Sequence, residues 1–154
     1  MKPLRMIGLL LVLLALGVPY VLSAHGNMLS SCFTVGGAFI TNLVDKTTEK
    51  GEVTGDLKGV VRGRILTSEP GVDKSLNLTL EHVITTDSGD EITTSDWAML
   101  TPITDNTFYW RQSQTITNGT GQYATMSGTL DEIGVVDMTT GEGVLRYNGK
   151  LCSK

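Results

Sequence analysis

From residue 32 onward, apolar and polar residues alternate with a period of two, and this alternation most constrains what the chain can fold into. It is clearest over residues 76–85, where one face carries Leu76, Leu78, Leu80, His82 and Ile84, and the other carries Asn77, Thr79, Glu81 and Thr85. Such alternation is typical of a β-strand with one buried face, whereas a helix repeats its apolar residues every three or four positions. Because threonine and glycine are also frequent, we predict an all-β domain with hardly any helix.

Strand signals recur at short intervals, separated by turn-forming residues. The predicted strands cover residues 32–43, 52–67, 76–85, 91–100, 107–117 and 122–131, followed by a last strand or strand pair over 135–152. The predicted turns lie at residues 69–71, 87–90, 118–121, 132–134 and 140–143. The paired glycines at 36–37 predict a bulge in the first strand. Seven to eight short strands at this spacing predict a barrel or a sandwich.

The two cysteines help to choose between these architectures. Cys32 begins the first predicted strand and Cys152 ends the last. In a closed antiparallel barrel with an even number of strands, these two positions face each other. Two thiols in an oxidising compartment usually pair, so we predict a Cys32–Cys152 disulfide and favour the barrel. A metal or redox pair is not favoured, because no further Cys or His stands at zinc-ligand spacing.

The N-terminus has the layout of a secretory signal. The basic residues Lys2 and Arg5 precede an apolar run from Met6 to Val18, and small residues follow at 23–24. The run is shorter than the roughly 20 apolar residues of a membrane-spanning helix. We therefore predict a signal peptide over residues 1–24, a barrel domain over 25–154, and a secreted or periplasmic location. Cleavage after Ser23 or Gly26 is an alternative to cleavage after Ala24.

A second interpretation of this region is a lipoprotein signal. Leu29-Ser30-Ser31-Cys32 resembles the box whose cysteine is lipidated. The polar residues 25–27 separate that box from the apolar run, whereas a lipoprotein signal usually runs straight into its box. The first interpretation is therefore favoured, and the alternative predicts an acylated Cys32 and a free Cys152.

The net charge of the chain limits which kinds of binding partner can be expected. Without Lys2 and Arg5, ten basic residues stand against 16 acidic ones, for a net charge of −6. No Lys/Arg cluster is present, so nucleic acid and anionic lipid surfaces are not expected as partners. We attribute the negative net charge to solubility. No integral membrane span is expected after cleavage of the signal peptide.

A glycine-rich segment in the C-terminal third carries a family resemblance. Residues 118–130, Asn-Gly-Thr-Gly-Gln-Tyr-Ala-Thr-Met-Ser-Gly-Thr-Leu, resemble the turn-and-strand motif of the allene oxide cyclase-like and dirigent-like barrels, with Asn118 where Gly is usual. The tail from Gly134 to Cys152 resembles the ending of uncharacterised exported bacterial members. The resemblance implies a single antiparallel eight-stranded calycin-like barrel, often oligomeric, whose plant members guide ring closure or radical coupling. None of their functional residues has a counterpart motif here.

His82 is the most informative single residue, because alternation places it on the inner face. A neutral imidazole there can act as an acid or base on a ligand, but a core His hydrogen-bonded to a neighbour is the favoured interpretation. An even-length loop at 87–90 would place Trp97 and Met99 beside that face, and an odd loop would reverse this. The predicted ligand-binding residues are His82, Trp97, Met99, Phe108, Trp110 and Tyr123. A filled interior is favoured over a hollow one, since aromatic residues on strands usually form core.

The other polar residues point to no specific chemistry. Glu81 and Asp96 are expected on the outer face, and the acidic residues at 87–91 form a solvated turn with no EF-hand spacing. The two sequons at Asn77 and Asn118 carry no weight in a bacterium. No nucleophile-elbow, zinc-protease or phosphate-loop motif is present, so no catalytic residue, metal or cofactor is assigned.

Three functions follow from these observations. The first is an exported barrel that binds a small apolar ligand in its lumen, or that serves as a structural or interaction module. The second is an isomerase or cyclase-type enzyme acting on an apolar ligand, which requires an acid–base pair aimed into a hollow lumen; whether the protein is an enzyme stays open. The third is the lipid-anchored form described above. A homo-oligomer is compatible with each.

Overall fold

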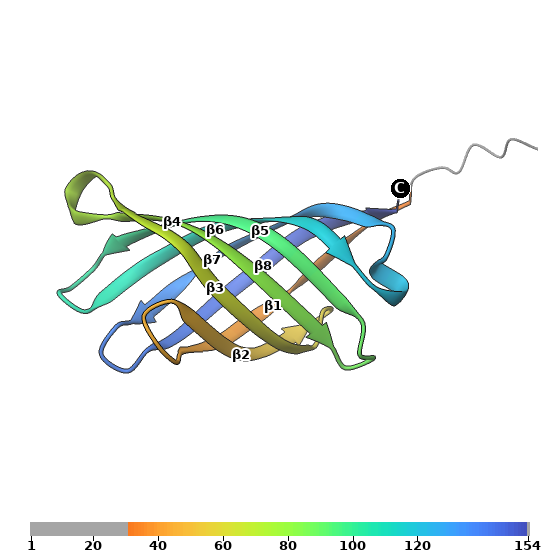
Figure 1. The fold of residues 1–154 in the computed structure, drawn as a ribbon, viewed down its shortest axis with the longest axis horizontal. Coiled ribbons are helices and arrows are strands. Elements are labelled where there is room, and N and C mark those ends of the chain that lie inside the picture. The colour runs from red at the N-terminus through yellow and green to blue at the C-terminus, as the bar shows by residue number, and fades with distance from the viewer. Residues whose placement is uncertain (1–30, 154) are drawn as a thin grey trace, which may run out of the picture.

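The computed structural model describes residues 31–153 and shows a closed barrel of eight antiparallel strands, each paired with its neighbours along the chain. The elements are β1 (Cys32–Leu43), β2 (Thr48–Gly55), β3 (Gly59–Pro70), η1 (Val72–Lys74), β4 (Leu76–Thr86), β5 (Glu91–Pro102), β6 (Thr107–Gly119), η2 (Gly121–Tyr123), β7 (Met126–Asp137) and β8 (Glu142–Ser153). Figure 1 shows the strands crossing the barrel obliquely, as closure of a sheet requires. The predicted all-β eight-stranded barrel is confirmed.

The barrel closes between β1 and β8. Their register is continuous from Cys32 opposite Cys152 to Asn42 opposite Glu142, and the two cysteines form a disulfide. The predicted bridge is therefore confirmed, and it occupies the Cys32 sulfur that lipidation would need. The predicted bulge at 36–37 is wrong, because the β1–β8 pairing runs through Gly36 and Gly37 without a shift and the β1–β2 pairing begins at Gly37. Gly37 instead allows close packing: a Cβ there would lie 2.8 Å from the ring of Tyr147.

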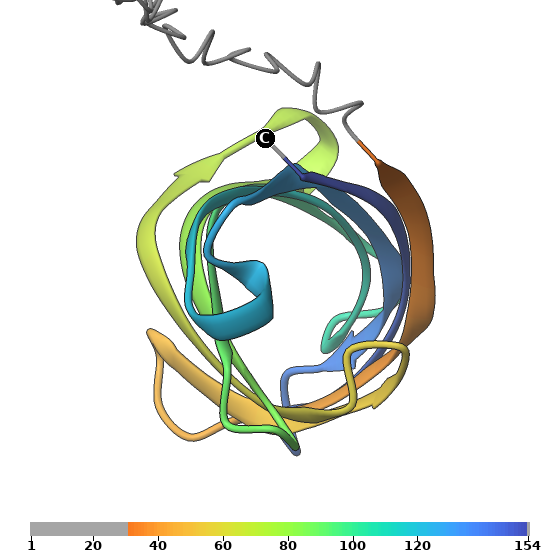
Figure 2. The ribbon, with the colours of Figure 1, turned by 90° about the vertical axis from the view of Figure 1, so that its right-hand side faces the viewer.

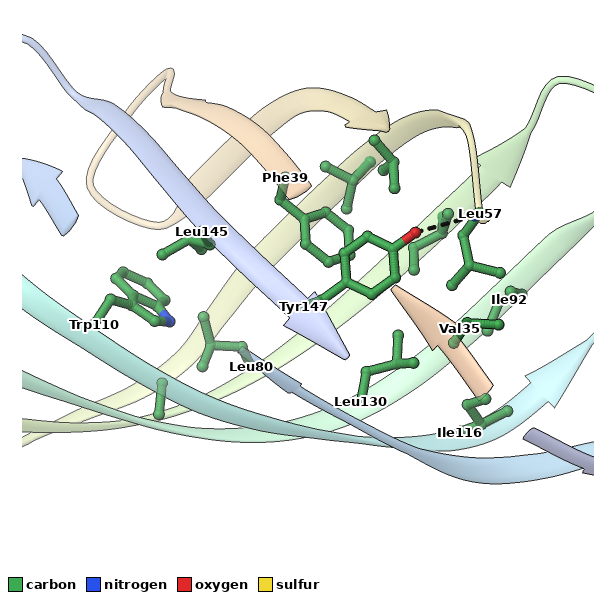
Figure 3. Packing of buried hydrophobic residues seen from close by; sticks show 14 of the residues in the cluster. Val35, Phe39, Leu57, Leu80, Ile92, Trp110, Ile116, Leu130, Leu145 and Tyr147 are labelled. Carbon is green, nitrogen blue, oxygen red and sulfur yellow. Dashed lines mark hydrogen bonds between the residues drawn. The ribbon is translucent and has the colours of Figure 1, made fainter. Parts of the chain in front are cut away.

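The interior is filled by side chains that point inward at every second position of each strand. Figure 3 shows the side chains of Phe39 and Tyr147 next to each other between the strands, with Trp110 and Leu130 on either side of them. The ring centroids of Phe39 and Tyr147 are 5.0 Å apart. Large residues lie beside small ones on neighbouring strands, as Leu130 does beside Gly149. A filled small barrel needs this alternation of sizes. The expectation of a filled interior holds for the middle of the barrel.

The two ends of the barrel differ. At one end η2 lies across the opening, and Figure 2 shows it within the outline of the wall. Tyr123, at the end of η2, is buried. The opposite end is surrounded by the connections β1–β2, β3–β4, β5–β6 and β7–β8. That second end is called the open mouth below.

The β4–β5 hairpin corrects three predictions. Thr86 and Asp90 are hydrogen-bonded across a loop of three residues, in which Gly89 has a φ of +86°. The loop is odd, so even-numbered residues face even-numbered ones, and Leu80 lies opposite Asp96. Asp96 is therefore inside, not outside as expected. Trp97 and Met99 are on the outer face, and Trp97 is 47% exposed.

Two predicted elements differ from those observed. Residues 52–67 are not one strand: β2 ends at Gly55, whose φ is +84°, and β3 starts at Gly59. The turn between them directs Leu57 inward, and its N–H donates to the Tyr147 hydroxyl (3.0 Å). The predicted turn at 132–134 is also wrong, because β7 continues to Asp137. The predicted signal peptide, the cleavage sites and residues 25–30 lie outside the described residues.

Residues 31–153 include no helix long and apolar enough to cross a membrane.

Breaking the disulfide should lower stability without changing the fold. The bridge joins residues 120 positions apart, so its loss frees a long loop in the unfolded chain. The Cys32→Ser/Cys152→Ser double variant should lose about 4–5 kcal/mol of unfolding free energy in the chain-entropy model. Urea denaturation of the variant and of the oxidised protein measures this difference. An unchanged unfolding free energy would contradict it.

Candidate functional site

A cluster of ionisable side chains lies in the middle of the barrel, and the strand register explains how it forms. Glu49 on β2 and His82 on β4 both pair with Gly63 on the strand between them. Because Gly63 has no side chain, the two residues meet across it, and the Glu49 carboxylate bonds to His82 Nε2. A Cβ at position 63 would lie 2.6 Å from Glu49 Cγ and would also collide with the imidazole.

The second nitrogen of His82 faces another carboxylate. Asp96 on β5 bonds to His82 Nδ1 through Oδ2. An imidazolium ring donates a hydrogen bond from each of its two nitrogens, and two carboxylates can accept these bonds. Burial alone would lower the pKa of His82, but the hydrogen bonds and charges of Asp96 and Glu49 outweigh it and raise the pKa to about 10. His82 thus acts as the cation of a buried triad, which agrees with its expected place in the core.

Gln112 connects this triad to Trp110. The Trp110 indole N–H donates to Gln112 Oε1 (2.7 Å), and Gln112 Nε2 donates to Asp96 Oδ2 (3.3 Å). Gln112 Nε2 also lies 3.4 Å from His82 Nδ1, but both are donors when the ring is charged, so this contact is no hydrogen bond. The two real bonds fix which way the Gln112 amide points.

Glu132 is the fourth ionisable member of the cluster. It lies opposite Gln112 on β7 and is 2% exposed. Burial raises the pKa of its carboxyl to about 8; the attraction of His82 opposes this rise, and Glu49 and Asp96 add to it. At neutral pH Glu132 is therefore mainly the uncharged acid. The four groups then sum to one negative charge, from one imidazolium and two carboxylates.

Oxygen acceptors predominate around the cluster. Among the described residues, four buried side-chain atoms lack a hydrogen-bond partner: Thr94 Oγ1, Asp96 Oδ1, Gln114 Oε1 and Glu132 Oε1. All four atoms can accept a hydrogen bond, whereas only the Thr94 hydroxyl and a protonated Glu132 carboxyl can donate one. A buried polar network with unpartnered members is costly. A proton on Glu132 lowers this cost, because it supplies a hydrogen-bond donor among oxygens most of which can only accept.

A cavity of about 480 Å³ opens at the mouth of the barrel, above the cluster. Its apolar wall comes from Leu43, Ile65, Leu76, Leu78, Leu100, Trp110 and Met138, and its rim from Asp45, Lys46, Ser68 and residues 139–141. Gln112 follows Trp110 by two residues on the inner face, which places it about 7 Å deeper along the strand. The cavity therefore ends at a layer containing Trp110, and the ionic cluster begins in the layer below.

The six predicted ligand-binding residues do not form one site. Trp110 lines the cavity, His82 lies in the cluster, and Tyr123 lies at the closed end of the barrel. Phe108 is half-buried and packs against the core from the mouth side. Trp97 and Met99 line a groove on the outer wall instead. Whether any of them binds a ligand stays a prediction.

Sequence reasoning missed four members of the cluster as functional residues. Glu49 lay outside the predicted strands, Glu132 was assigned to a turn, and Asp96 was expected outside. Gln112 lay within the strand predicted over residues 107–117, but no role was attached to it. The usable signal was the alternation of β7, where Leu130, Glu132 and Gly134 occupy every second position.

The described residues contain no group of three His, Cys, Asp or Glu side chains arranged to hold a metal ion. In the acidic turn at 87–91, Asp87 pairs with Lys58 at 2.8 Å, and Asp90 accepts from Ser88 Oγ at 3.1 Å. Asp87 thus contacts the β2–β3 turn, and Asp90 bonds within its own turn.

No family model matches this sequence, and no curated protein matches it either. Among solved structures, the chain is similar to the pterocarpan synthase dirigent protein GePTS1, with 14% identity and a TM-score of 0.36. The match covers 88% of this chain and 99% of that chain. Such a likeness concerns barrel architecture at most. Membership of the allene oxide cyclase-like and dirigent-like family stays a prediction.

A methyl group at Gly63 should destabilise the protein through the Glu49–His82 contact. Gly63→Ala should lower the unfolding free energy by about 1–3 kcal/mol, as overpacking of a filled core does. Gly36→Ala is the matched control, because a Cβ there would meet only the Tyr147 carbonyl oxygen at an ordinary 3.5 Å. Urea denaturation of both variants measures the difference, and equal losses would contradict the role assigned to Gly63.

His82 should remain an imidazolium well above neutral pH. Nitrogen NMR of the imidazole should show both ring nitrogens protonated at about pH 8, given the raised pKa. Because that pKa lies above the unfolded value of 6.5, the stabilisation is fully present below about pH 6.5 and is lost as pH rises through about 10. Unfolding free energies measured across this range should fall accordingly. A neutral tautomer at pH 8 would refute the triad.

Proposed function

We propose that this protein binds a small apolar molecule in the cavity at the open mouth of the barrel. The cavity itself is the observation that supports the proposal. Its volume of about 480 Å³ falls within the range of about 300–1,000 Å³ typical of small-molecule sites. Leucine, isoleucine and methionine side chains form most of its wall, together with the Trp110 indole. This combination suits an alkyl or aromatic body.

The polar groups of the cavity lie at its rim. Asp45 already accepts hydrogen bonds from the backbone N–H groups of Thr47 (2.7 Å) and Thr48 (2.8 Å), and these bonds lower the pKa of its carboxyl. Asp45 therefore shapes the β1–β2 connection. Lys46 and the residues around Thr139 remain to contact a polar end of the ligand. A molecule with an apolar body and a small polar end fits this distribution.

Binding is supported better than catalysis on that ligand. An isomerase or cyclase needs an acid or base that touches the reacting atoms. His82 and Glu132 do not line the cavity, because the layer containing Trp110 lies between. The ionic cluster is instead positioned to support the floor of the site.

Export remains part of the proposal. The Cys32–Cys152 disulfide is compatible with an oxidising compartment, where such bonds persist. A secreted or periplasmic barrel with an apolar cavity would carry or sequester its ligand outside the cytoplasm.

A neutral apolar dye should bind in the cavity and report on Trp110. Of the two tryptophans, Trp97 is on the outer wall, so a Trp97→Phe background leaves Trp110 as the emitter. In that background, N-phenylnaphthylamine should bind with a dissociation constant on the order of micromolar and quench Trp110 saturably.

Two serine variants locate the binding. Ser68→Phe should fill the rim of the cavity and weaken dye binding by about tenfold or more, which corresponds to about 1.4 kcal/mol. Ser95→Phe makes the same change at an exposed position of β5 outside the cavity and should leave binding unchanged. Equal affinities of the two variants, or no saturable binding at all, would overturn the proposal.

A further inference from the structure

We propose that the protonation state of the buried Glu132 regulates ligand binding at the open mouth, through Gln112 and Trp110. The inference rests on the proposed ligand cavity and adds a form of regulation to that site. It depends on three observations: a direct chain of hydrogen bonds, the position of Glu132 beside that chain, and the unpartnered oxygens around it.

The chain runs from the wall of the cavity to the centre of the barrel. Trp110 lines the cavity, and its N–H is held by Gln112 at 2.7 Å. The other end of the same amide is held by Asp96 at 3.3 Å. An amide has one acceptor end and one donor end, so a change at the donor end reorients both. Trp110 is thus coupled to the charges beneath it by one side chain.

Glu132 lies directly opposite Gln112 in the β6–β7 register. The ionisable groups that act on it come from three other strands: Glu49 on β2, His82 on β4 and Asp96 on β5. On β8 its register partner is Tyr147. The Tyr147 hydroxyl donates to Thr54 O (2.9 Å) and accepts from Leu57 N–H, so it is committed elsewhere.

Ionisation of Glu132 changes what Gln112 can bind. The neutral acid leaves the Gln112 amide to Asp96 through a long hydrogen bond. The carboxylate is a stronger acceptor, and it adds a second net negative charge to the buried interior. The Gln112 NH₂ group then turns toward Glu132, its Oε1 moves away from the indole, and Trp110 loses its anchor. The floor of the cavity becomes less ordered, and ligand affinity falls.

The pKa of Glu132, about 8, places this change within an accessible pH range. Raising the pH through that value removes the proton and should weaken binding. Linkage is reciprocal, so ligand binding should in turn raise the pKa of Glu132 and draw a fraction of a proton into the protein near pH 8. Proton uptake is a readout that a merely structural role of Glu132 would not produce.

The experiment compares the Trp97→Phe protein with the same protein carrying Glu132→Gln, a neutral side chain of the same shape. N-phenylnaphthylamine is the probe, since it is uncharged over the whole range. Between about pH 6 and about pH 9 the parent should lose affinity at least about fivefold, the lower end of typical couplings. Glu132→Gln should keep the higher affinity at both pH values. Calorimetry in two buffers of different ionisation enthalpy should show proton uptake in the parent and none in the variant.

Asp131→Asn is the matched control, because it removes a carboxylate from the adjacent, exposed position of β7 and should leave the pH dependence intact. A pH dependence that persists in Glu132→Gln, or no proton uptake by the parent, would overturn the inference. If the dye binds at no pH, the proposed ligand function fails while the coupling is still tested by Trp110 emission. That emission should change through about pH 8 in the parent and stay constant in Glu132→Gln; a constant emission in both would overturn the coupling.

Discussion

The pairing of β1 with β8 is the constraint on which the rest of the structure depends. Once the sheet closes, every strand has two partners and one face that must fit a fixed, narrow interior. Side chains then compete for space, so large residues require small ones on the neighbouring strand. Tyr147 beside Gly37 meets this need with an aromatic ring. At Gly63 the Glu49–His82 ion pair occupies the space that a side chain would fill. The buried cluster thus depends on closure of the barrel and on the absence of a side chain at position 63.

Alternation predicted the features that depend on one strand alone. A period of two predicted the bounds of β1, the inner face of β4 and the position of Trp110. The disulfide was predicted because its cysteines lie at the start of the first strand and the end of the last. The β4–β5 connection was not predictable in the same way. Its Asp-Ser-Gly-Asp turn suits a loop of three or four residues, and one residue exchanges the two faces of β5. The three-residue loop put Asp96 inside and Trp97 outside.

The ionic cluster could not be predicted from the pattern of each strand taken alone, for a related reason. A glutamate within a strand signals an outer face or a turn, because a lone buried carboxylate is costly. Glu49 is tolerated inside because His82 on β4 binds its carboxylate. Glu132 is tolerated because its raised pKa keeps the carboxyl protonated at neutral pH. That information lies in the register between strands, which depends on where β2 ends and β7 continues. The sequence pattern placed both boundaries incorrectly, so the residues that meet in the core could not be brought together.

Stability alone is a weak reason for such a cluster. Apolar residues of similar volume often replace buried ionic groups with no loss, or with a gain, in stability. The middle of this barrel nevertheless holds an imidazolium, two carboxylates and a buried acid. Among the described residues, buried oxygens of Asp96 and Glu132 within the cluster, and of Thr94 and Gln114 beside it, have no hydrogen-bond partner. The arrangement lies one layer beneath an apolar cavity and is joined to it by a single glutamine. A core that only had to fill space would need neither the charges nor the link, and this argues that the cluster serves the cavity above it.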